Sequence, residues 1–460
     1  FMALSTDMLT VLEHCRVAPP PATVPEKSLP LTLFDLPWLH FPRIQRLLFY
    51  DFPYSKTHFI DTIIPNLKHS ASLALKHYFP LAGNLIIPQN SSKPEIRYID
   101  GDSVSLTFAE SRSDFNNLTG DHARNGNEFY HLVPQMPQVT NVSDTKVVPL
   151  LALQVTVFPY FGICFGYTFH HVAADGNTLI RFLRSWASIT KLGRDAVLLG
   201  GGSLPFYDRN VSSKDPSGLE KSLWSQVREM KLDEGDQVQY PPTNNVRATF
   251  VMGQDHVQRL KKLVLARRPT LLHVSTFTVT CTYVWVCLVK SRADGGAKAA
   301  GEDELEDFVC VADCRACFEP PIPETYFGNC LITCFATMKN SQLVGEDGFL
   351  IAAELIGEAI SKRPRHEEGV LKGMESWVSK LGEKWERLVG VAGSPRLGVY
   401  DTDFGWGRPK KTEIISIDVT GAMSLNECRD SEGDLEVGLS LPKIQMDAFA
   451  AIFADGLKML

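Results

Sequence analysis

The sequence predicts an α/β fold, because segments with strand character alternate with segments of helical character along its 460 residues. Residues 151–158 and 163–169 are rich in β-branched and aromatic side chains and are separated by a short turn, which predicts a hairpin. Apolar residues then recur at helical spacing from Leu179 to Trp186, so a helix is expected to begin after Gly176. A side chain at this strand-to-helix junction can be held rigidly while it faces a cleft.

The composition is that of an ordinary globular protein, with 44% hydrophobic and 22% charged residues, and the length allows two domains with separate cores. A net charge of -7 argues against a nucleic-acid partner. No apolar segment approaches the length that spans a bilayer, and the beginning of the sequence lacks a charged region followed by an apolar one. We therefore expect a soluble, cytoplasmic protein with no membrane partner, acting as a monomer.

Composition along the chain predicts two domains joined by a long crossover. The N-terminal domain is expected to span 1–202, and 203–245 is rich in Gly, Pro, Ser, Asp and Asn, as a linker would be. The C-terminal domain, 246–460, is expected to open with a strand at 246–252. An amphipathic helix should follow from about Asp255.

Five of the ten cysteines cluster between 310 and 334, and the spacing of Cys314 and Cys317 is also found in zinc knuckles. The surrounding residues read as apolar strands, in which cysteine behaves as a small hydrophobe. We expect reduced, buried thiols and no metal, and a zinc-binding module remains the alternative.

Two short motifs carry the functional signal. His171 and Asp175 form a His-x-x-x-Asp sequence at the expected strand-to-helix junction. Alone this motif is weak, because a histidine at the end of a strand is commonly a structural residue. The second motif is Asp403-Phe-Gly-Trp-Gly407, in a turn far along the chain.

With these two motifs in this order, the chain resembles the BAHD family of plant coenzyme-A-dependent acyltransferases. The resemblance extends nearly end to end, through Tyr78-Phe-Pro-Leu-Ala-Gly83, Pro205-Phe-Tyr-Asp-Arg209 and Leu435-Glu-Val-Gly-Leu-Ser-Leu441. Tyr326-Phe-Gly-Asn-Cys330 resembles a motif of the subgroup that transfers malonyl groups to anthocyanin and flavonoid glycosides. The resemblance implies a chloramphenicol-acetyltransferase-like fold, with two similarly built α/β domains, mixed sheets flanked by helices, and a solvent channel between them that holds the histidine.

The chemistry implied for this site is acyl transfer with His171 as the general base. A neutral alcohol is a poor nucleophile, and an imidazole titrates close to working pH, so it can take the proton of the acceptor hydroxyl. His170 should point to the opposite face and be structural. The resemblance implies that Asp175 turns away from the pocket, pairs with Arg315 and orients the site.

The family resemblance also gives the loop at 403–407 a structural role on the coenzyme side of the channel. Its two glycines allow a tight turn and its indole fills a large volume. The residues expected to act in this way are Asp403, Gly405, Trp406 and Gly407.

Coenzyme A carries phosphates, and the densest basic group of the chain, at 261–268, precedes an expected apolar helix at 275–290. A helix N-terminus and its hydroxyls provide further donors for an anion. Coenzyme A contacts are therefore expected from Lys261, Arg268, Ser275 and Thr276. The alternative for the basic residues is a solvated helix face.

Three further expectations concern the acyl group and the acceptor. A free malonyl carboxylate needs a cation, for which Arg181 is the first candidate and Arg184 the next. Asn329 is expected to orient the donor, with strand packing as the alternative. Asp35 and Trp38 match the family's segment at the acceptor mouth, where an aromatic plane would suit a flavonoid ring.

The sequence thus predicts transfer of malonyl from malonyl-CoA to a sugar hydroxyl of an anthocyanin or other flavonoid glucoside, without a permanent cofactor. The alternative within this class is another donor, acetyl-CoA or hydroxycinnamoyl-CoA. A serine hydrolase is the alternative from another class, but the sequence contains no Gly-x-Ser-x-Gly nucleophile turn.

Overall fold

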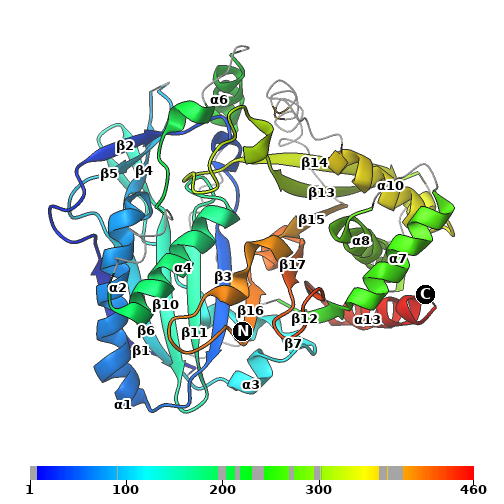
Figure 1. Ribbon diagram of the computed structural model, residues 1–460, viewed down its shortest axis with the longest axis horizontal. Helices are drawn as coiled ribbons and strands as arrows, with labels where there is room; N and C mark the ends of the chain where they lie inside the picture. Colours follow the sequence, from blue (N-terminus) through cyan, green and yellow to red (C-terminus); the bar gives the residue numbers. More distant parts are fainter. Residues whose placement is uncertain are drawn as a thin grey trace.

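Two large mixed β-sheets, each covered by helices, form the molecule, as the α/β prediction requires (Figure 1). The computed structural model describes residues 8–90, 92–194, 204–212, 218–230, 243–268, 274–294, 301, 303–361, 370, 374 and 387–459. Much of the expected linker at 203–245 lies outside the described residues.

The first sheet has six strands in the order β1-β6-β10-β11-β3-β16. Its centre is the predicted hairpin, in which Leu151 lies opposite Phe169. Every residue of both hairpin strands is buried, which explains their continuous apolar character. The strands are β1 (Leu9–Val17), β3 (Ile44–Asp51), β6 (Val104–Ser111), β10 (Leu151–Phe158), β11 (Gly162–Phe169) and β16 (Lys411–Ile414).

The second sheet has seven strands in the order β14-β13-β15-β17-β18-β12-β7. The two sheets share part of their strand order. In each, a hairpin (β10–β11 or β17–β18) is followed by another strand of the same half (β3 or β12) and then by a strand from the other half (β16 or β7). The strands are β7 (Arg124–Asn125), β12 (Asn245–Met252), β13 (Leu305–Asp313), β14 (Leu331–Lys339), β15 (Leu388–Ala392), β17 (Met423–Glu427) and β18 (Leu435–Pro442).

The two halves of the chain exchange edge strands, so β16 completes the first sheet and β7 completes the second. A buried ion cluster holds this exchange together: Glu413 accepts from Arg124 at 2.7 Å and from Arg247 at 3.1 Å, and Arg247 also binds Asp418. Burial opposes the ionisation of Glu413, but the two guanidinium groups outweigh it and lower the pKa of this carboxyl to about 2. The cluster fixes the relative placement of the two sheets.

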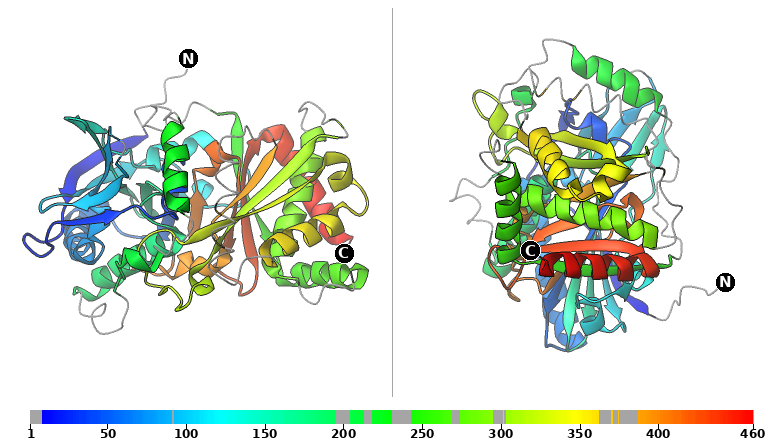
Figure 2. Two further views of the ribbon diagram at one scale, coloured as in Figure 1. Left: turned by 90° about the horizontal axis from the view of Figure 1, so that it is seen from above. Right: turned by 90° about the vertical axis from the view of Figure 1, so that its right-hand side faces the viewer.

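Helices cover the outer faces of both sheets, as the two views of Figure 2 show. Helix α4 (Gly176–Leu192) packs beside α2 (Ile64–His77) on the first sheet, with Leu179, Phe182 and Trp186 buried. The second sheet carries α7 (Gln254–Arg267), α8 (Thr276–Asp294), α10 (Gly348–Ser361) and α13 (Lys443–Lys458). The helices predicted after Gly176, from about Asp255 and at 275–290 are therefore confirmed within a few residues.

A smaller third sheet and several short helices complete the described structure. The third sheet has the order β2-β5-β4-β9-β8 and consists of β2 (Lys27–Pro30), β4 (Asn84–Pro88), β5 (Glu95–Tyr98), β8 (Thr140–Val142) and β9 (Thr145–Pro149). The remaining α-helices are α1 (Lys56–His58), α3 (Phe115–Leu118), α6 (Leu219–Glu229), α9 (Asn340–Val344) and α12 (Ile417–Thr420). Among the described helices, none combines the length and apolar character needed to cross a membrane.

The cysteines of the expected cluster lie on β13, β14 and the turns that follow or precede them. Cys310 lies opposite Cys334 in the sheet, and the sulfur atoms of Cys314 and Cys330 are 3.4 Å apart in the buried core. All ten cysteines are free thiols. Burial raises the pKa of the Cys314 thiol, which disfavours the thiolate that a metal would need.

Candidate active site

His171 stands two residues beyond the end of β11, and the turn that carries it leads directly into α4. Asp175 is the N-cap of this helix, because its Oδ1 accepts a hydrogen bond from the backbone N–H of Thr178 at 2.9 Å. The strand fixes one side of the turn and the capped helix fixes the other. His171 is therefore held on a short, rigid connection.

The second oxygen of Asp175 forms the ion pair expected from the family resemblance. Oδ2 lies 2.8 Å from Nη2 of Arg315 and also accepts from the backbone N–H of Cys330 at 3.3 Å. Asp175 is 1% exposed, and Arg315 binds Asp313 with its other terminal nitrogen at 2.5 Å. With its acceptors used in this way, Asp175 holds α4 against the second half of the chain, and no carboxylate of the described residues forms a hydrogen bond with the imidazole, which Asp175 influences only through its charge.

Aromatic rings surround the imidazole of His171. The ring of Trp38 stacks on it, with centroids 3.8 Å apart and planes 8° from parallel. Phe41 meets it edge-on, with centroids 5.7 Å apart, and Phe169 lies tilted against it at 5.9 Å. The histidine remains half-buried and reaches the cavity described below. Its burial lowers its pKa to about 4, and nearby polar groups reverse this only in part. The imidazole is therefore neutral at physiological pH, the form that a general base requires.

Asn329 fixes which imidazole nitrogen carries the proton. Its amide nitrogen faces three acceptors, the backbone oxygens of His171 and Val172 at 2.9 Å and 3.3 Å and Oδ1 of Asp35 at 3.0 Å. The amide oxygen must then lie on the other side, where it is 3.1 Å from Nδ1 of His171. This oxygen can only accept, so Nδ1 donates and Nε2 keeps its lone pair. Asn329 is completely buried, and it contacts the base instead of orienting the donor as expected.

Asp35 supports this arrangement from behind. It is 0% exposed and accepts from the backbone N–H of Asn329 at 3.1 Å, from Thr32 and from Arg209 at 3.0 Å. The expectation that Asp35 lines the acceptor mouth is therefore wrong. The carboxylate of Asp35 points into the protein because its hydrogen-bond donors are buried there. Trp38, three residues further along the chain, lines the cavity.

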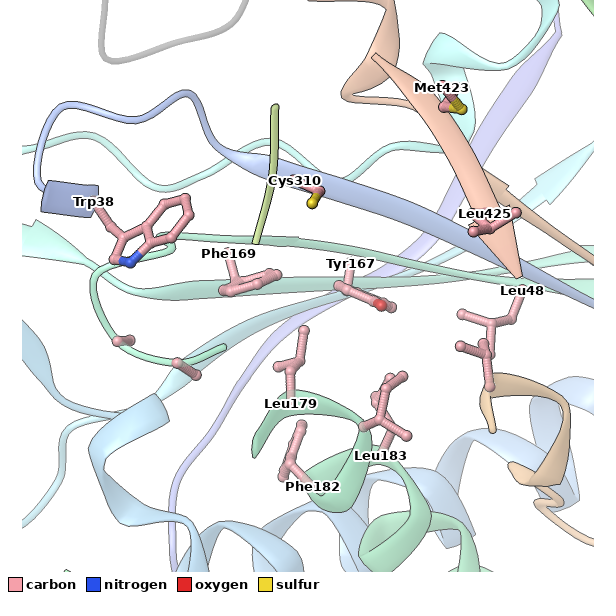
Figure 3. Packing of buried hydrophobic residues seen from close by; sticks show 14 of the residues in the cluster. Trp38, Leu48, Tyr167, Phe169, Leu179, Phe182, Leu183, Cys310, Met423 and Leu425 are labelled. Atoms are coloured by element: carbon pink, nitrogen blue, oxygen red, sulfur yellow. The ribbon is translucent and has the colours of Figure 1, made fainter. Parts of the chain in front are cut away.

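A cavity of about 1960 Å³ opens beside His171, and residues from both halves of the chain line it. Single-ligand sites reach about 1000 Å³, so this cavity has room for two substrates. Figure 3 shows Tyr167 and Phe169 side by side on β11, with Leu179 of α4 beneath them and Trp38 at one end. These four residues line the cavity together with residues of β13 and β15, so the lining combines β11 and α4 from the first half with strands of the second.

Arg181 and Arg184, the two residues expected to bind the carboxylate of the acyl group, both line this cavity. Arg181 lies 3.3 Å from Glu324, whose side chain is 87% exposed. Arg184 donates to the backbone oxygens of Leu397 and Gly398 and lies 3.2 Å from Asp401. Both guanidinium groups are thus engaged near the solvent.

The candidates for coenzyme A contact divide into two groups. Lys261, Ser275 and Thr276 line the cavity, and Ser275 caps α8 by accepting from the backbone N–H of Thr278 at 3.0 Å. Arg268 lies away from the described lining residues, 3.3 Å from Glu354 of α10. Arg268 is the C-cap residue of α7, about two turns beyond Lys261, and its side chain contacts α10 instead of the cavity.

The loop at 403–407 lies outside the lining of this cavity, although all five of its residues are described. Asp403 closes the loop by accepting from the backbone N–H groups of Gly405 at 2.7 Å and Gly407 at 2.9 Å, and both glycines have positive φ. Trp406 packs against Phe404, Phe52 and Tyr50 of the first half. The loop packs on the face of the first sheet that carries Phe165, because Phe404 stacks on that ring, and the expected role on the coenzyme side of the channel stays a prediction.

Sequence reasoning missed three residues that line the cavity beside His171, namely Phe41, Tyr167 and Arg46. Two of them read as ordinary core aromatics. The sequence does contain a signal for Arg46, because it is a charged residue directly before the apolar run 47–50, and arginine is rarely buried without a partner.

The chain was compared with known proteins. It matches the model of the Transferase family over residues 8–455. It is 47% identical over 454 residues to malonyl-coenzyme A:anthocyanin 3-O-glucoside-6''-O-malonyltransferase of Dahlia pinnata, with 98% of each chain covered. It is 49% identical over 458 residues to phenolic glucoside malonyltransferase 1 of Nicotiana tabacum, with 98% of this chain and 100% of the relative covered.

Among solved structures, vinorine synthase has the same fold, with a TM-score of 0.66, 21% identity and 96% of each chain covered. The family match covers nearly the whole chain, and the two relatives are matched over at least 98% of their length. The chain therefore belongs to the BAHD acyltransferases of the Transferase family and is a coenzyme-A-dependent acyltransferase.

Proposed function

We propose that this enzyme transfers a malonyl group from malonyl-CoA to a sugar hydroxyl of an anthocyanin or other phenolic glucoside. The names of the dahlia and tobacco relatives support this donor and this class of acceptor. The observation that carries the mechanism is the neutral imidazole of His171, with Nδ1 bound to Asn329 and Nε2 left free as a base beside a cavity large enough for two substrates.

In this mechanism Nε2 of His171 takes the proton of the sugar hydroxyl as its oxygen attacks the thioester carbonyl. A tetrahedral intermediate forms and collapses, and the imidazolium returns the proton to the departing coenzyme A thiolate. Both substrates are bound together and the enzyme is not acylated. A positioned base of this kind contributes about 100- to 10,000-fold, and the alignment of the two substrates contributes the rest.

The donor enters with its phosphates towards Lys261 and the N-terminus of α8, where Ser275 and Thr276 line the cavity. The stacked ring of Trp38 and the rings of Phe41 and Phe169 give the reacting centre apolar walls. Such walls exclude water and limit hydrolysis of the thioester.

The test is a donor screen with purified enzyme. Malonyl-CoA, acetyl-CoA and coumaroyl-CoA are each incubated with a flavonoid glucoside and with the corresponding aglycone, and the products are weighed by mass spectrometry. We expect a gain of one malonyl mass on the glucoside and none on the aglycone. His171→Ala should stay folded, still bind coenzyme A and lose nearly all transfer. A preference for acetyl-CoA or coumaroyl-CoA, or an active His171→Ala variant, would contradict the proposal.

A further inference from the structure

Arg46 is a buried arginine on the floor of the cavity. It is the third residue of β3, its exposed fraction is 7%, and Tyr167 is its partner in the neighbouring strand. Side chains of a strand alternate between two faces, and paired residues of antiparallel strands share a face. Ile44, Arg46, Tyr167 and Phe169 therefore project together, and all four line the cavity.

The charge of Arg46 is not matched by a carboxylate in the part of the chain that the structure describes. The carboxylates that line the cavity are already used, since Asp175 and Asp313 bind Arg315 and Glu324 binds Arg181. A buried charge without an opposite charge is costly, and an anionic ligand removes that cost. We therefore expect Arg46 to bind an anionic group of a ligand in the cavity.

The position of Arg46 indicates which anion it receives. Its positive charge is close enough to His171 to help lower the pKa of that imidazole, and it also counteracts the effect of burial on the pKa of Tyr167. An anion at Arg46 therefore lies beside the reacting carbonyl. The phosphates of coenzyme A are far from that carbonyl along the pantetheine arm, whereas a malonyl thioester carries its carboxylate one methylene group away from it.

We propose that Arg46 binds the free carboxylate of the malonyl group and so selects malonyl-CoA over neutral donors. This inference rests on the proposed function and assigns the acyl-specificity residue within it. A planar guanidinium can donate two parallel hydrogen bonds to a carboxylate, which fixes the acyl group as well as neutralising it. A neutral acyl group leaves the same guanidinium with its hydrogen bond to Tyr167 but without an opposite charge, so Arg46 both favours malonyl and disfavours acetyl.

The sequence-based candidate, Arg181, provides the natural comparison. Its side chain is 27% exposed and already pairs with Glu324, so a carboxylate bound there would displace an existing partner in contact with water. Surface ion pairs of this kind contribute little to selectivity. Arg46 is enclosed and has no such competitor among the described residues.

The experiment compares kcat/KM for malonyl-CoA and acetyl-CoA, with one flavonoid glucoside, in wild type, Arg46→Met, Arg46→Lys and Arg181→Met. Arg46→Met should lower kcat/KM for malonyl-CoA by about 10- to 100-fold, the range for a lost hydrogen bond to a charged group, and leave or raise that for acetyl-CoA. Arg46→Lys should keep part of the malonyl preference, because it keeps the charge without the paired donors. Arg181→Met should change the ratio of the two donors by less than threefold.

Other outcomes decide against the assignment. An equal loss for both donors in a folded Arg46→Met protein, checked by circular dichroism and thermal unfolding, would give Arg46 a general role and overturn it. So would a collapse of malonyl preference in Arg181→Met alone. If Arg46→Met does not fold, Arg46→Lys carries the test, and an unchanged donor ratio there overturns the proposal.

The failure of the proposed function is separately visible, as wild-type enzyme that transfers no malonyl. In that case malonyl-CoA and coenzyme A are compared as inhibitors of whichever donor is used. Arg46 retains its assignment as a carboxylate site if Arg46→Met weakens inhibition by malonyl-CoA on the order of tenfold and leaves inhibition by coenzyme A unchanged. Equal inhibition in wild type and variant would remove that assignment as well.

Discussion

The amide oxygen of Asn329 lies 3.1 Å from Nδ1 of His171, and the amide nitrogen of the same side chain is held by backbone oxygens and by Asp35. Asn329 therefore acts on the reaction through the histidine as a positioning residue. In water the other tautomer of a free imidazole, with the proton on Nε2, is also populated, and that tautomer has no base facing the cavity.

We predict that Asn329→Leu lowers kcat by about 100-fold, the effect of misplacing a catalytic group, while the KM for malonyl-CoA changes little. Steady-state kinetics with varied donor separate the two constants. Asn177→Ala is the matched control, because Asn177 lines the same cavity and its amide donates to the backbone oxygen of Glu324. An equal change in KM and kcat, or equal losses in the two variants, would contradict the positioning role.

The ion pair between Asp175 and Arg315 gives a prediction about stability. Both side chains are buried, and removing one leaves the other charged, so Asp175→Asn should lower the free energy of unfolding by about 3–5 kcal/mol. The double variant Asp175→Asn with Arg315→Met should be less destabilised than the sum of the two single variants. Urea unfolding of the four proteins measures this coupling. Unchanged stability together with lost activity in Asp175→Asn would instead show a direct part in catalysis.

The sequence was sufficient for the local structure around His171. A strand, a turn and a helix are readable from side-chain periodicity, and the Asp175–Arg315 pair followed from family resemblance. Periodicity shows which face of an element is buried, but it does not show what covers that face. Nothing in the sequence indicated that Asp35, Asn329 and His171 meet.

The exchanged strands show the same limit at the level of the fold. β7 has two residues and β16 has four, too short to be read as strands, and each pairs with the opposite half of the chain. The role of Trp38 was also out of reach, because an aromatic residue in a loop can cover an acceptor or stack on a base, and only the three-dimensional structure distinguishes them.

The coenzyme A contacts give a prediction that separates neighbouring lysines. Lys261 lines the cavity and Lys262, next to it on α7, is exposed away from it. Lys261→Ala should raise the KM for malonyl-CoA by about three- to tenfold, since a half-exposed ion pair retains only part of the strength of a buried one. Lys262→Ala and Arg268→Ala should leave it within twofold. Donor saturation curves at low and high salt provide the measurement, and equal effects at Lys261 and Lys262 would place the phosphates elsewhere.

Buried histidines make the stability of the enzyme depend on pH. Burial lowers the pKa of both His131 and His171 from 6.5 to about 4, so both stay neutral in the folded protein while the unfolded chain takes up protons. Between pH 6.5 and about pH 4 the unfolded state binds more protons than the folded state, so the free energy of unfolding falls as the pH is lowered. Each histidine contributes up to about 1.4 kcal/mol per pH unit.

Buried carboxyls such as Glu427 and Glu436, whose pKa values burial raises, act in the opposite direction, so the total slope does not isolate the histidines. His131→Gln does, because His131 lies away from the cavity lining and glutamine can still bind Ser111 and Ser113 as the imidazole does. Urea unfolding at several pH values between 4.5 and 7.5 should give the variant a shallower dependence than wild type below about pH 6.5, by about one proton. The two proteins should run parallel above pH 7. Parallel curves throughout the range would mean that the imidazole of His131 takes up its proton as readily in the folded enzyme as in the unfolded chain.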